Sequence, residues 1–148
     1  MFLMVGNGMN KKSMAYVGNV VQFVKFCIET KSPGYRVYNY VDKPDMTMNE
    51  LVKQVETSLN RKHSNLRFPY WMGYAGGLAF DLIAFVTRKK LSISSVRIKK
   101  FCASTQADAS KVSNSGFLAP FTLSEGLHRT LQYEFIDRKD NEITFESE

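Results

Sequence analysis

The 148-residue sequence has few side chains that bind transition metals, because it contains only two cysteines and two histidines. Cys27 and Cys102 lie far apart, in apolar or small-residue surroundings, and they lack the spacing of a metal site. His63 and His128 are isolated as well. We therefore expect no metal centre, and two reduced thiols in a cytoplasmic protein in preference to a disulfide.

Long uninterrupted apolar runs are also missing. The stretch Pro69–Val86 comes nearest, but Asp81 and three glycines interrupt it, and it is flanked by Arg67 and by Arg88-Lys89-Lys90. These features favour a buried or surface-lying helix over a membrane span. Phe2–Val5 is too short for the apolar part of a signal peptide and no basic residue precedes it, so none is predicted.

The familiar catalytic patterns are absent from the sequence. No tyrosine has a lysine four positions later, and there is no His-Glu-x-x-His, Cys-x-x-Cys or Gly-x-Ser-x-Gly. Gly6-Asn7-Gly8 lacks the third glycine of a dinucleotide fingerprint, since Lys11 occupies that place. A plain hairpin turn is the favoured interpretation of these glycines. We expect no catalytic and no cofactor-binding residue in this chain.

What is present is a globular composition with an excess of positive charge. Hydrophobic residues make up 44% and charged residues 23%, and the net charge is +6. Such an excess favours anionic partners, which include nucleic acid, phosphorylated small molecules and acidic membrane surfaces. Basic residues cluster at 11–12, 61–62, 88–90 and 97–100, whereas residues 137–148 form an acidic polar tail.

Helix and strand signals alternate along the chain and predict an α/β fold, or a helix-dominated α+β fold. The expected strands lie at 2–5 and 36–41, and an extended piece lies at 14–17. Helices are expected at about 18–30, 48–59 and 69–86. Two further helices are expected to begin at Ser94 or Ser95 and after Thr122. The helix at 18–30 carries an apolar stripe made of Val20, Val21, Val24, Cys27 and Ile28. Thr47 with Glu50, and Thr122 with Glu125, have the spacing of capping boxes.

One basic cluster has a spacing that suits a phosphate. Arg97 and Lys100 lie three residues apart on one face of a short helix, with Lys99 beside them. Solvated surface charges are the ordinary interpretation. The sharper hypothesis is a diphosphate clamp, because arginine and lysine together neutralise and orient phosphate oxygens.

The order of several motifs resembles one protein family. Gly6-Asn7-Gly8 is followed by Lys12 and by Val17-Gly18-Asn19-Val20. A later pattern consists of Asp108, Ser110, Lys111, Gly116, Phe117, Pro120, Leu123, Glu125, Gly126 and Leu127. Together they resemble the C-terminal, substrate-binding part of NAD-dependent epimerase/dehydratases of the extended short-chain dehydrogenase/reductase family, over residues 2 to about 136.

The resemblance implies a function in polysaccharide biosynthesis. The chain would be the part, residues 1–136, that binds a nucleotide-diphosphate sugar, and it would be catalytically inert alone. NAD or NADP would be bound by an N-terminal Rossmann part that precedes these residues in the family. Lys12 takes the place of the family's first diphosphate-binding basic residue, and Arg97 or Lys100 takes the second.

A function of another class stays open at this point. The charges at 88–100 and the apolar helix at 69–86 would also suit a small basic module for an anionic membrane surface or nucleic acid. Nucleic acid is disfavoured, because the basic residues lie between apolar aromatics and form no exposed aromatic-basic array. Peripheral membrane contact through 69–90 and self-association through exposed apolar surface are further possibilities.

The sequence predicts that the 148-residue chain neither binds NAD(H) nor turns over a nucleotide sugar. A dinucleotide needs a glycine-rich turn that leads into a helix N-terminus, and the chemistry needs a tyrosine activated by a nearby lysine. Calorimetric titration with NAD(H) should therefore show no saturable heat. Saturable binding with micromolar affinity would contradict this expectation.

Overall fold

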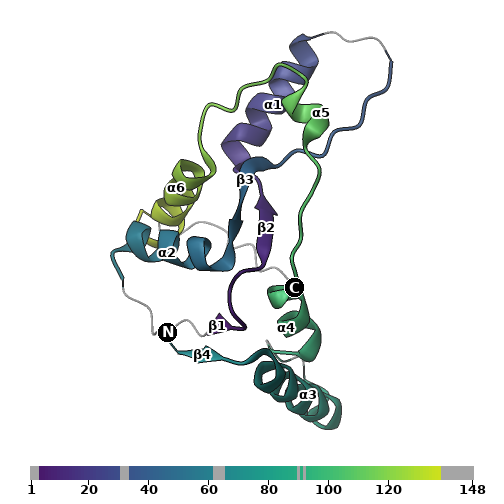
Figure 1. Ribbon diagram of the computed structural model, residues 1–148, viewed down its shortest axis with the longest axis vertical. Helices are drawn as coiled ribbons and strands as arrows, with labels where there is room; N and C mark the ends of the chain where they lie inside the picture. Colours follow the sequence, from purple (N-terminus) through teal and green to yellow (C-terminus); the bar gives the residue numbers. More distant parts are fainter. Residues whose placement is uncertain (1–3, 31–33, 62–65, 90, 92, 138–148) are drawn as a thin grey trace. The chain divides into compact units, whose positions relative to one another are not determined.

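The computed structural model describes residues 4–30, 34–61, 66–89, 91 and 93–137. This part of the chain is rich in helix and has a few short strands, as the sequence predicts (Figure 1). In chain order the elements are β1 (Met4–Val5), β2 (Lys11–Met14), α1 (Val17–Glu29), β3 (Asp42–Thr47), α2 (Met48–Leu59), β4 (Arg67–Phe68), α3 (Tyr70–Thr87), α4 (Ser95–Cys102), α5 (Ser110–Ser113) and α6 (Leu123–Phe135).

The chain divides into two compact units, which are described separately. Unit 1 comprises Met1–Ser13, Asp45–Leu51 and Lys62–Ala107. Unit 2 comprises Met14–Pro44, Val52–Arg61 and Asp108–Glu148. Each unit is therefore assembled from three stretches of sequence. The expected division into 1–136 and a tail at 137–148 stays a prediction, because residues 138–148 lie outside the described part.

Both predicted capping boxes are confirmed. The Thr122 backbone N–H donates to Glu125 Oε2 at 2.8 Å, and the Glu125 N–H donates to Thr122 Oγ1 at 3.2 Å. Thr47 and Glu50 make the same pair of bonds, at 2.8 Å and 3.2 Å. These backbone hydrogen bonds lower the pKa of both glutamates. The helices α2 and α6 begin directly after the two threonines because their first N–H groups are satisfied there.

In unit 1, β1 pairs in parallel with β4, with Met4 opposite Arg67 and Val5 opposite Phe68. The expected strand at 2–5 is thus confirmed for Met4–Val5, and residues 2–3 lie outside the described part. The hairpin interpretation of Gly6-Asn7-Gly8 is wrong, because β2 pairs with β3 and not with β1. Gly6 and Gly8 instead have φ of +83° and +68° and turn the chain from one two-stranded sheet to the other.

The helices α3 and α4 of unit 1 lie side by side (Figure 1). The face of α3 toward α4 is made of small residues. A Cβ added at Gly77 would lie 2.7 Å from Ser95 Cα, so only glycine permits this approach of the two backbones. Asp81 Oδ2 accepts the Ser95 backbone N–H at 3.1 Å and so caps the start of α4. The expected helices at 69–86 and from Ser94 or Ser95 are confirmed.

The core of unit 2 is an aromatic cluster around Phe23 of α1. The Phe23 ring lies 5.3 Å from Tyr38, 4.9 Å from Tyr40 and 5.2 Å from Phe117, between ring centroids. The expected strand at 36–41 is wrong: this segment has no strand partner among the described residues, and its alternate tyrosines, Tyr38 and Tyr40, pack on Phe23. The composition of 36–41 favoured a strand, but composition cannot supply the partner strand that a sheet needs.

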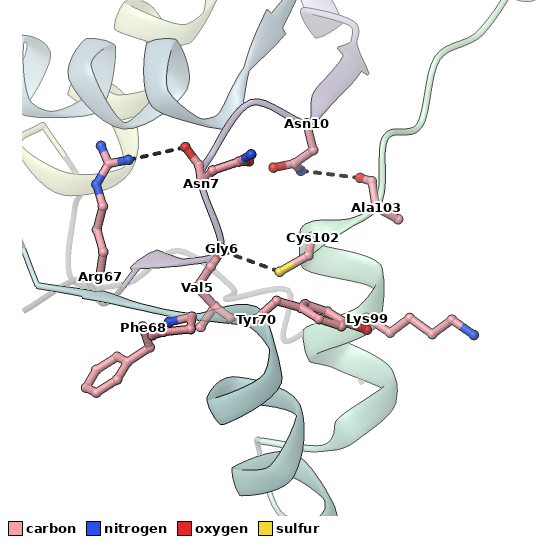
Figure 2. A pocket seen from close by; sticks show the side chains of 11 residues that line it. Val5, Gly6, Asn7, Asn10, Arg67, Phe68, Tyr70, Lys99, Cys102 and Ala103 are labelled. Atoms are coloured by element: carbon pink, nitrogen blue, oxygen red, sulfur yellow. Dashed lines mark hydrogen bonds between the residues drawn. The ribbon is translucent and has the colours of Figure 1, made fainter.

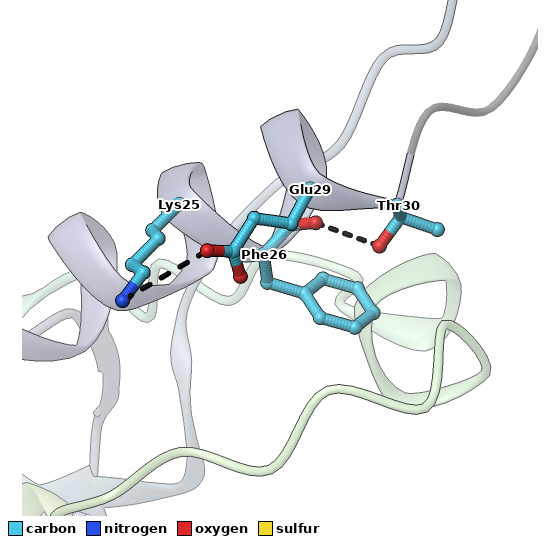
Figure 3. A network of polar contacts seen from close by, with 4 residues as sticks. All are labelled: Lys25, Phe26, Glu29 and Thr30. Atoms are coloured by element: carbon cyan, nitrogen blue, oxygen red, sulfur yellow. Dashed lines mark hydrogen bonds and ion pairs between the residues drawn. The ribbon is translucent and has the colours of Figure 1, made fainter.

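The apolar stripe expected on α1 is only partly on its inner face. Val21, Val24 and Ile28 are more than half exposed, while Asn19 and Phe23 are the buried residues of this helix. The aromatic partners of Phe23 set the rotation of α1, so the side that carries Phe23 faces inward. At the far end of the helix, Lys25 pairs with Glu29 at 3.9 Å and Thr30 Oγ1 donates to the Phe26 carbonyl at 2.6 Å (Figure 3).

A buried polar network connects three segments of unit 2. Asn19 is fully buried, and its Nδ2 donates to Asp42 Oδ1 at 2.9 Å and to the Phe121 carbonyl at 2.8 Å. Its Oδ1 accepts the Phe121 N–H at 3.1 Å. Asp42 also accepts the Tyr16 N–H and the Tyr40 hydroxyl. Because these buried groups are satisfied by one another, the network fixes α1 against the start of β3 and against the segment before α6.

The contact between α3 and α4 predicts different effects for two adjacent glycines. Gly77→Ala should lower the free energy of unfolding by about 1–3 kcal/mol, because the methyl group would meet the Ser95 backbone. Gly76→Ala is the matched control, since a Cβ there meets nothing within 4 Å. It should raise stability by roughly 0.5–1 kcal/mol through helix propensity. Urea titration measures both, and equal effects would refute the close approach at Gly77.

Candidate binding site

Unit 1 contains a pocket of about 680 Å³ (Figure 2). It lies where the loop after β1, the step from β4 into α3, and the last turn of α4 come together. Its walls are formed by Val5, Gly6, Asn7, Asn10, Arg67, Phe68, Pro69, Tyr70, Lys99, Cys102 and Ala103. The pocket therefore combines an apolar floor with a small number of polar groups, as binding sites for small molecules do.

Side-chain bonds to the backbone hold the loop that borders the pocket. The Asn7 carbonyl accepts Arg67 Nη1 at 3.2 Å and Asn49 Nδ2 at 3.0 Å (Figure 2). Asn10 Nδ2 donates to the carbonyls of Phe101 and Ala103, at 2.9 and 3.3 Å. These bonds tie residues 7–10 to β4, to α2 and to the end of α4, so the loop keeps a defined path without belonging to a strand.

The charged residues on the pocket wall are both basic. Arg67 and Lys99 line it, and the described lining residues include no carboxylate. A guanidinium has five N–H donors, and the bond to the Asn7 carbonyl uses one of them. Each of these side chains can bind phosphate oxygens, but Figure 2 draws them on opposite sides of the pocket, with the Lys99 ammonium pointing away from Arg67. The wall is therefore suited to an anionic group attached to a partly apolar molecule.

The residues that the sequence predicted for a diphosphate belong to the same unit, but none of them is among the described lining residues of this pocket. Lys12 Nζ donates to the Lys100 carbonyl at 2.8 Å and to Thr105 Oγ1 at 3.4 Å, so its ammonium lies against the last turn of α4. Arg97 and Lys100 are exposed on α4. The structure thus brings Lys12 to α4 across 88 residues of sequence. That the three share one anion stays a prediction.

Two basic residues of the pocket were not predicted as site residues. Lys99 was noted only as the neighbour of Arg97 and Lys100, and Arg67 only as a flank of the apolar stretch. Arg67 reaches the pocket because β4 pairs with β1. No local spacing in the sequence signals that pairing, since the two strands have two residues each.

Cys102 is the one thiol on the pocket wall among the described lining residues. Its Sγ donates to the Val5 carbonyl at 3.4 Å (Figure 2). Burial raises the pKa of the Cys102 thiol, and the positive charge of Lys12 acts in the opposite direction. Cys102 therefore stays a protonated, weakly nucleophilic side chain at neutral pH.

Neither a metal centre nor a membrane span is found in the described residues. They contain no group of three or more His, Cys, Asp or Glu residues that could hold a metal ion. None of the helices in the described part is long and apolar enough to cross a membrane.

The comparison with curated proteins confirms the resemblance that the motif order indicates, which is to the C-terminal part of an NAD-dependent epimerase. The relative is the N-acetyl-alpha-D-glucosaminyl-diphospho-ditrans,octacis-undecaprenol 4-epimerase of Escherichia coli O157:H7. It is 58% identical over 147 residues, which are 99% of this chain. The chain spans 44% of the length of that relative and corresponds to its C-terminal region.

Two other comparisons give no match. No family model matches the chain, and no solved structure matches it. The structure shows a helix-rich chain with a few short strands, and an origin in the extended short-chain dehydrogenase/reductase fold stays a prediction.

The place of Cys102 predicts that a bound ligand protects it. If this pocket takes the sugar diphosphate that the name of the relative describes, a form of it with a short, water-soluble prenyl chain should slow alkylation of Cys102 by N-ethylmaleimide at least threefold, because it would cover the pocket wall. Cys27, which lies in unit 2, is the internal control and should react at an unchanged rate. Mass spectrometry of the labelled peptides measures both rates. Equal protection of the two cysteines, or none, would contradict a ligand in this pocket.

Proposed function

We propose that this chain is the part of an NAD-dependent epimerase that binds the diphosphate-linked sugar. The observation that carries the proposal is the 58% identity to an undecaprenyl-linked N-acetylglucosamine 4-epimerase over 99% of the chain. The pocket of unit 1 supports it, because its basic wall suits a diphosphate. Of the activity of the whole relative, we assign to this chain only the binding of the substrate.

The diphosphate is the chemical feature that the possible substrates share. The name of the relative describes N-acetylglucosamine joined through a diphosphate to undecaprenol. A nucleotide-diphosphate sugar has the same sugar and diphosphate with a nucleoside in place of the polyprenol. Both would present several anionic phosphate oxygens to Arg67 and Lys99, and the sugar would occupy the rest of the pocket.

The other half of the reaction would be carried out by residues that this chain does not supply. Epimerases of this family use NAD. The turn at Gly6 and Gly8 leads into β2, so it does not place a helix N-terminus where the pyrophosphate of a dinucleotide would bind. We infer that the residues of this chain bind and orient the substrate and take no part in hydride transfer.

The proposed affinity is weak. A charged hydrogen bond to phosphate contributes about 1.5–3 kcal/mol when partly desolvated, and less when it is open to water. Two or three such contacts correspond to a dissociation constant on the order of a millimolar. The alternative function, a small basic module for an anionic membrane surface or nucleic acid, is supported by no comparison.

Charge reversal on α4 tests this proposal by calorimetry with the short-chain N-acetylglucosaminyl diphosphate. Lys99→Glu should weaken binding at least tenfold, because it replaces a cation of the pocket wall by an anion. Lys12→Glu and Arg97→Glu should each weaken it severalfold if the diphosphate extends to the predicted residues. Lys53→Glu, an exposed lysine of unit 2, should leave binding unchanged.

The relative loss of affinity in these variants decides whether the pocket is the binding site. If Lys99→Glu and Lys53→Glu weaken binding equally, the effect is one of net charge and the pocket is not the site. A titration with UDP-N-acetylglucosamine under the same conditions tells whether a nucleoside or a prenyl chain improves binding. No saturable heat with either ligand would overturn the proposed function.

A further inference from the structure

The outward surface of α3 is formed by large apolar side chains. Phe85 is 83% exposed, Trp71 70% and Leu82 65%. The other large apolar residues of this helix that are exposed are Tyr70, Met72, Tyr74, Leu78, Phe80, Ile83 and Val86. A contiguous apolar surface of this kind marks a contact with a partner or with a lipid surface. We call these ten residues the α3 apolar face.

The exposure of this face follows from how α3 packs. Its contact with the rest of unit 1 is made by Gly73, which lies against Val5, and by Gly77, which lies against Ser95 and Ile98. Asp81 continues the same side of the helix and binds the start of α4. Because the small residues face inward, the large ones must face outward. This is the reverse of the pattern of an ordinary surface helix.

The basic surround of α3 consists of residues that flank this helix in the sequence or lie on the neighbouring helix α4. Between Leu66 and Ala107 the described residues include six cations, namely Arg67, Arg88, Lys89, Arg97, Lys99 and Lys100. Asp81 is the one acidic residue among the described residues of that stretch, and it is half-buried and bonded to the Ser95 N–H. An apolar surface that is flanked by cations is complementary to a bilayer with anionic headgroups.

The pocket and the α3 apolar face are continuous. Tyr70 is the first residue of α3 and also lines the pocket, and Lys99 on α4 belongs both to the pocket wall and to the basic surround (Figure 2). The aromatic residues Tyr70, Trp71 and Tyr74 lie in the first turns of α3, next to the pocket. Tyrosine and tryptophan are the residues that favour the headgroup level of a bilayer.

We propose that α3 lies in the interface of an anionic phospholipid bilayer, with the α3 apolar face in the acyl-chain boundary and the surrounding cations at the headgroups. This inference rests on the proposed function, because a diphosphate carried by a polyprenol is held at the headgroup level of a membrane. Docking through α3 brings the mouth of the pocket to that level. The helix axis then runs along the plane of the bilayer.

A second copy of the chain is a less suitable occupant of this face. Two copies that met through α3 would bring the same six cations against one another with only Asp81 to offset them on each side, among the described residues of that stretch. Like charges across an interface oppose association. Anionic lipid phosphates, by contrast, would neutralise them.

Trp71 supplies a built-in probe, because it is the one tryptophan of the sequence and is 70% exposed. Fluorescence of the full chain should shift to the blue when vesicles of equal parts phosphatidylglycerol and phosphatidylethanolamine are added. Lipids brominated in the acyl chain should quench it. Vesicles of phosphatidylcholine alone should bind at least tenfold more weakly, because they carry no net charge.

Two matched variants locate the contact. Phe85→Glu should weaken binding to the anionic vesicles at least tenfold in co-sedimentation. Leu118→Glu is the control, since Leu118 is 88% exposed but belongs to unit 2, and it should bind as the parent chain does. Circular dichroism spectra of both variants establish that they remain folded.

Three results would overturn the inference. One is a Trp71 emission that stays that of a water-exposed indole in the presence of anionic vesicles. Another is equal loss of vesicle binding in Phe85→Glu and Leu118→Glu. The third is a blue shift that appears without lipid and grows with protein concentration, which would assign the face to a second copy. The vesicle experiments contain no sugar ligand, so their failure would not contradict the proposed function. Calorimetric binding of the short-chain diphosphate tests that function separately.

Discussion

The close approach of α3 and α4 at Gly77 is the constraint on which unit 1 depends. It requires a residue without a Cβ, since the Ser95 backbone occupies the space where a Cβ would be. It also places Asp81 on the Ser95 N–H, so that α4 begins at a fixed point. The last turn of α4 then carries Lys99 and Cys102 to the pocket wall. One steric fact thus connects the packing of a helix pair to the position of a binding site.

The same constraint explains why the apolar residues of α3 face outward. A helix that buries its small side chains cannot also bury its large ones on the same side. Helix α3 therefore has two different surfaces. Its small residues contact the backbone of α4, and its large apolar residues are exposed toward a partner. The partner that we propose is a lipid surface, which would also present the diphosphate that the pocket binds.

The motifs that carry the family resemblance have a structural explanation in unit 2. A Cβ at Gly18 or at Gly126 would collide with the ring of Tyr16, at 2.6 and 2.4 Å, so both glycines make room for this ring. Asn19, from the same motif as Gly18, joins α1 to Asp42 and Phe121. These residues therefore identify the family by its scaffold.

Local signals predicted the helices well, because capping boxes, proline and apolar spacing act within a few residues. Helix α2 begins and ends where Thr47 and the pattern of Leu51 to Leu59 predicted. Contacts between residues that are far apart in the sequence could not be predicted from such local signals. The segment 36–41 looks like a strand by composition, yet it packs on Phe23 without a partner strand in the described part of the chain.

The predicted site residues stay a prediction. Lys12 lies against α4, which carries Arg97 and Lys100, but none of the three is among the described lining residues of the pocket. Arg67 was missed as a site residue because its place depends on the two-residue pairing of β1 with β4. Lys99 lines the pocket from α4, whose place depends on the close contact of Gly77 with Ser95 and Ile98. Neither fact can be read from neighbouring residues in the sequence.

Amide chemical-shift mapping of the isotope-labelled chain tests most directly whether the pocket of unit 1 binds the diphosphate-linked sugar. On titration with the short-chain N-acetylglucosaminyl diphosphate, we predict saturable shifts confined to the residues around the pocket, at 5–10, 67–70 and 99–103. We predict none in the smaller hollow of unit 2 that is lined by Phe26, Arg36 and Tyr38. Saturable shifts centred on that second hollow, with the first unchanged, would contradict binding in the pocket of unit 1.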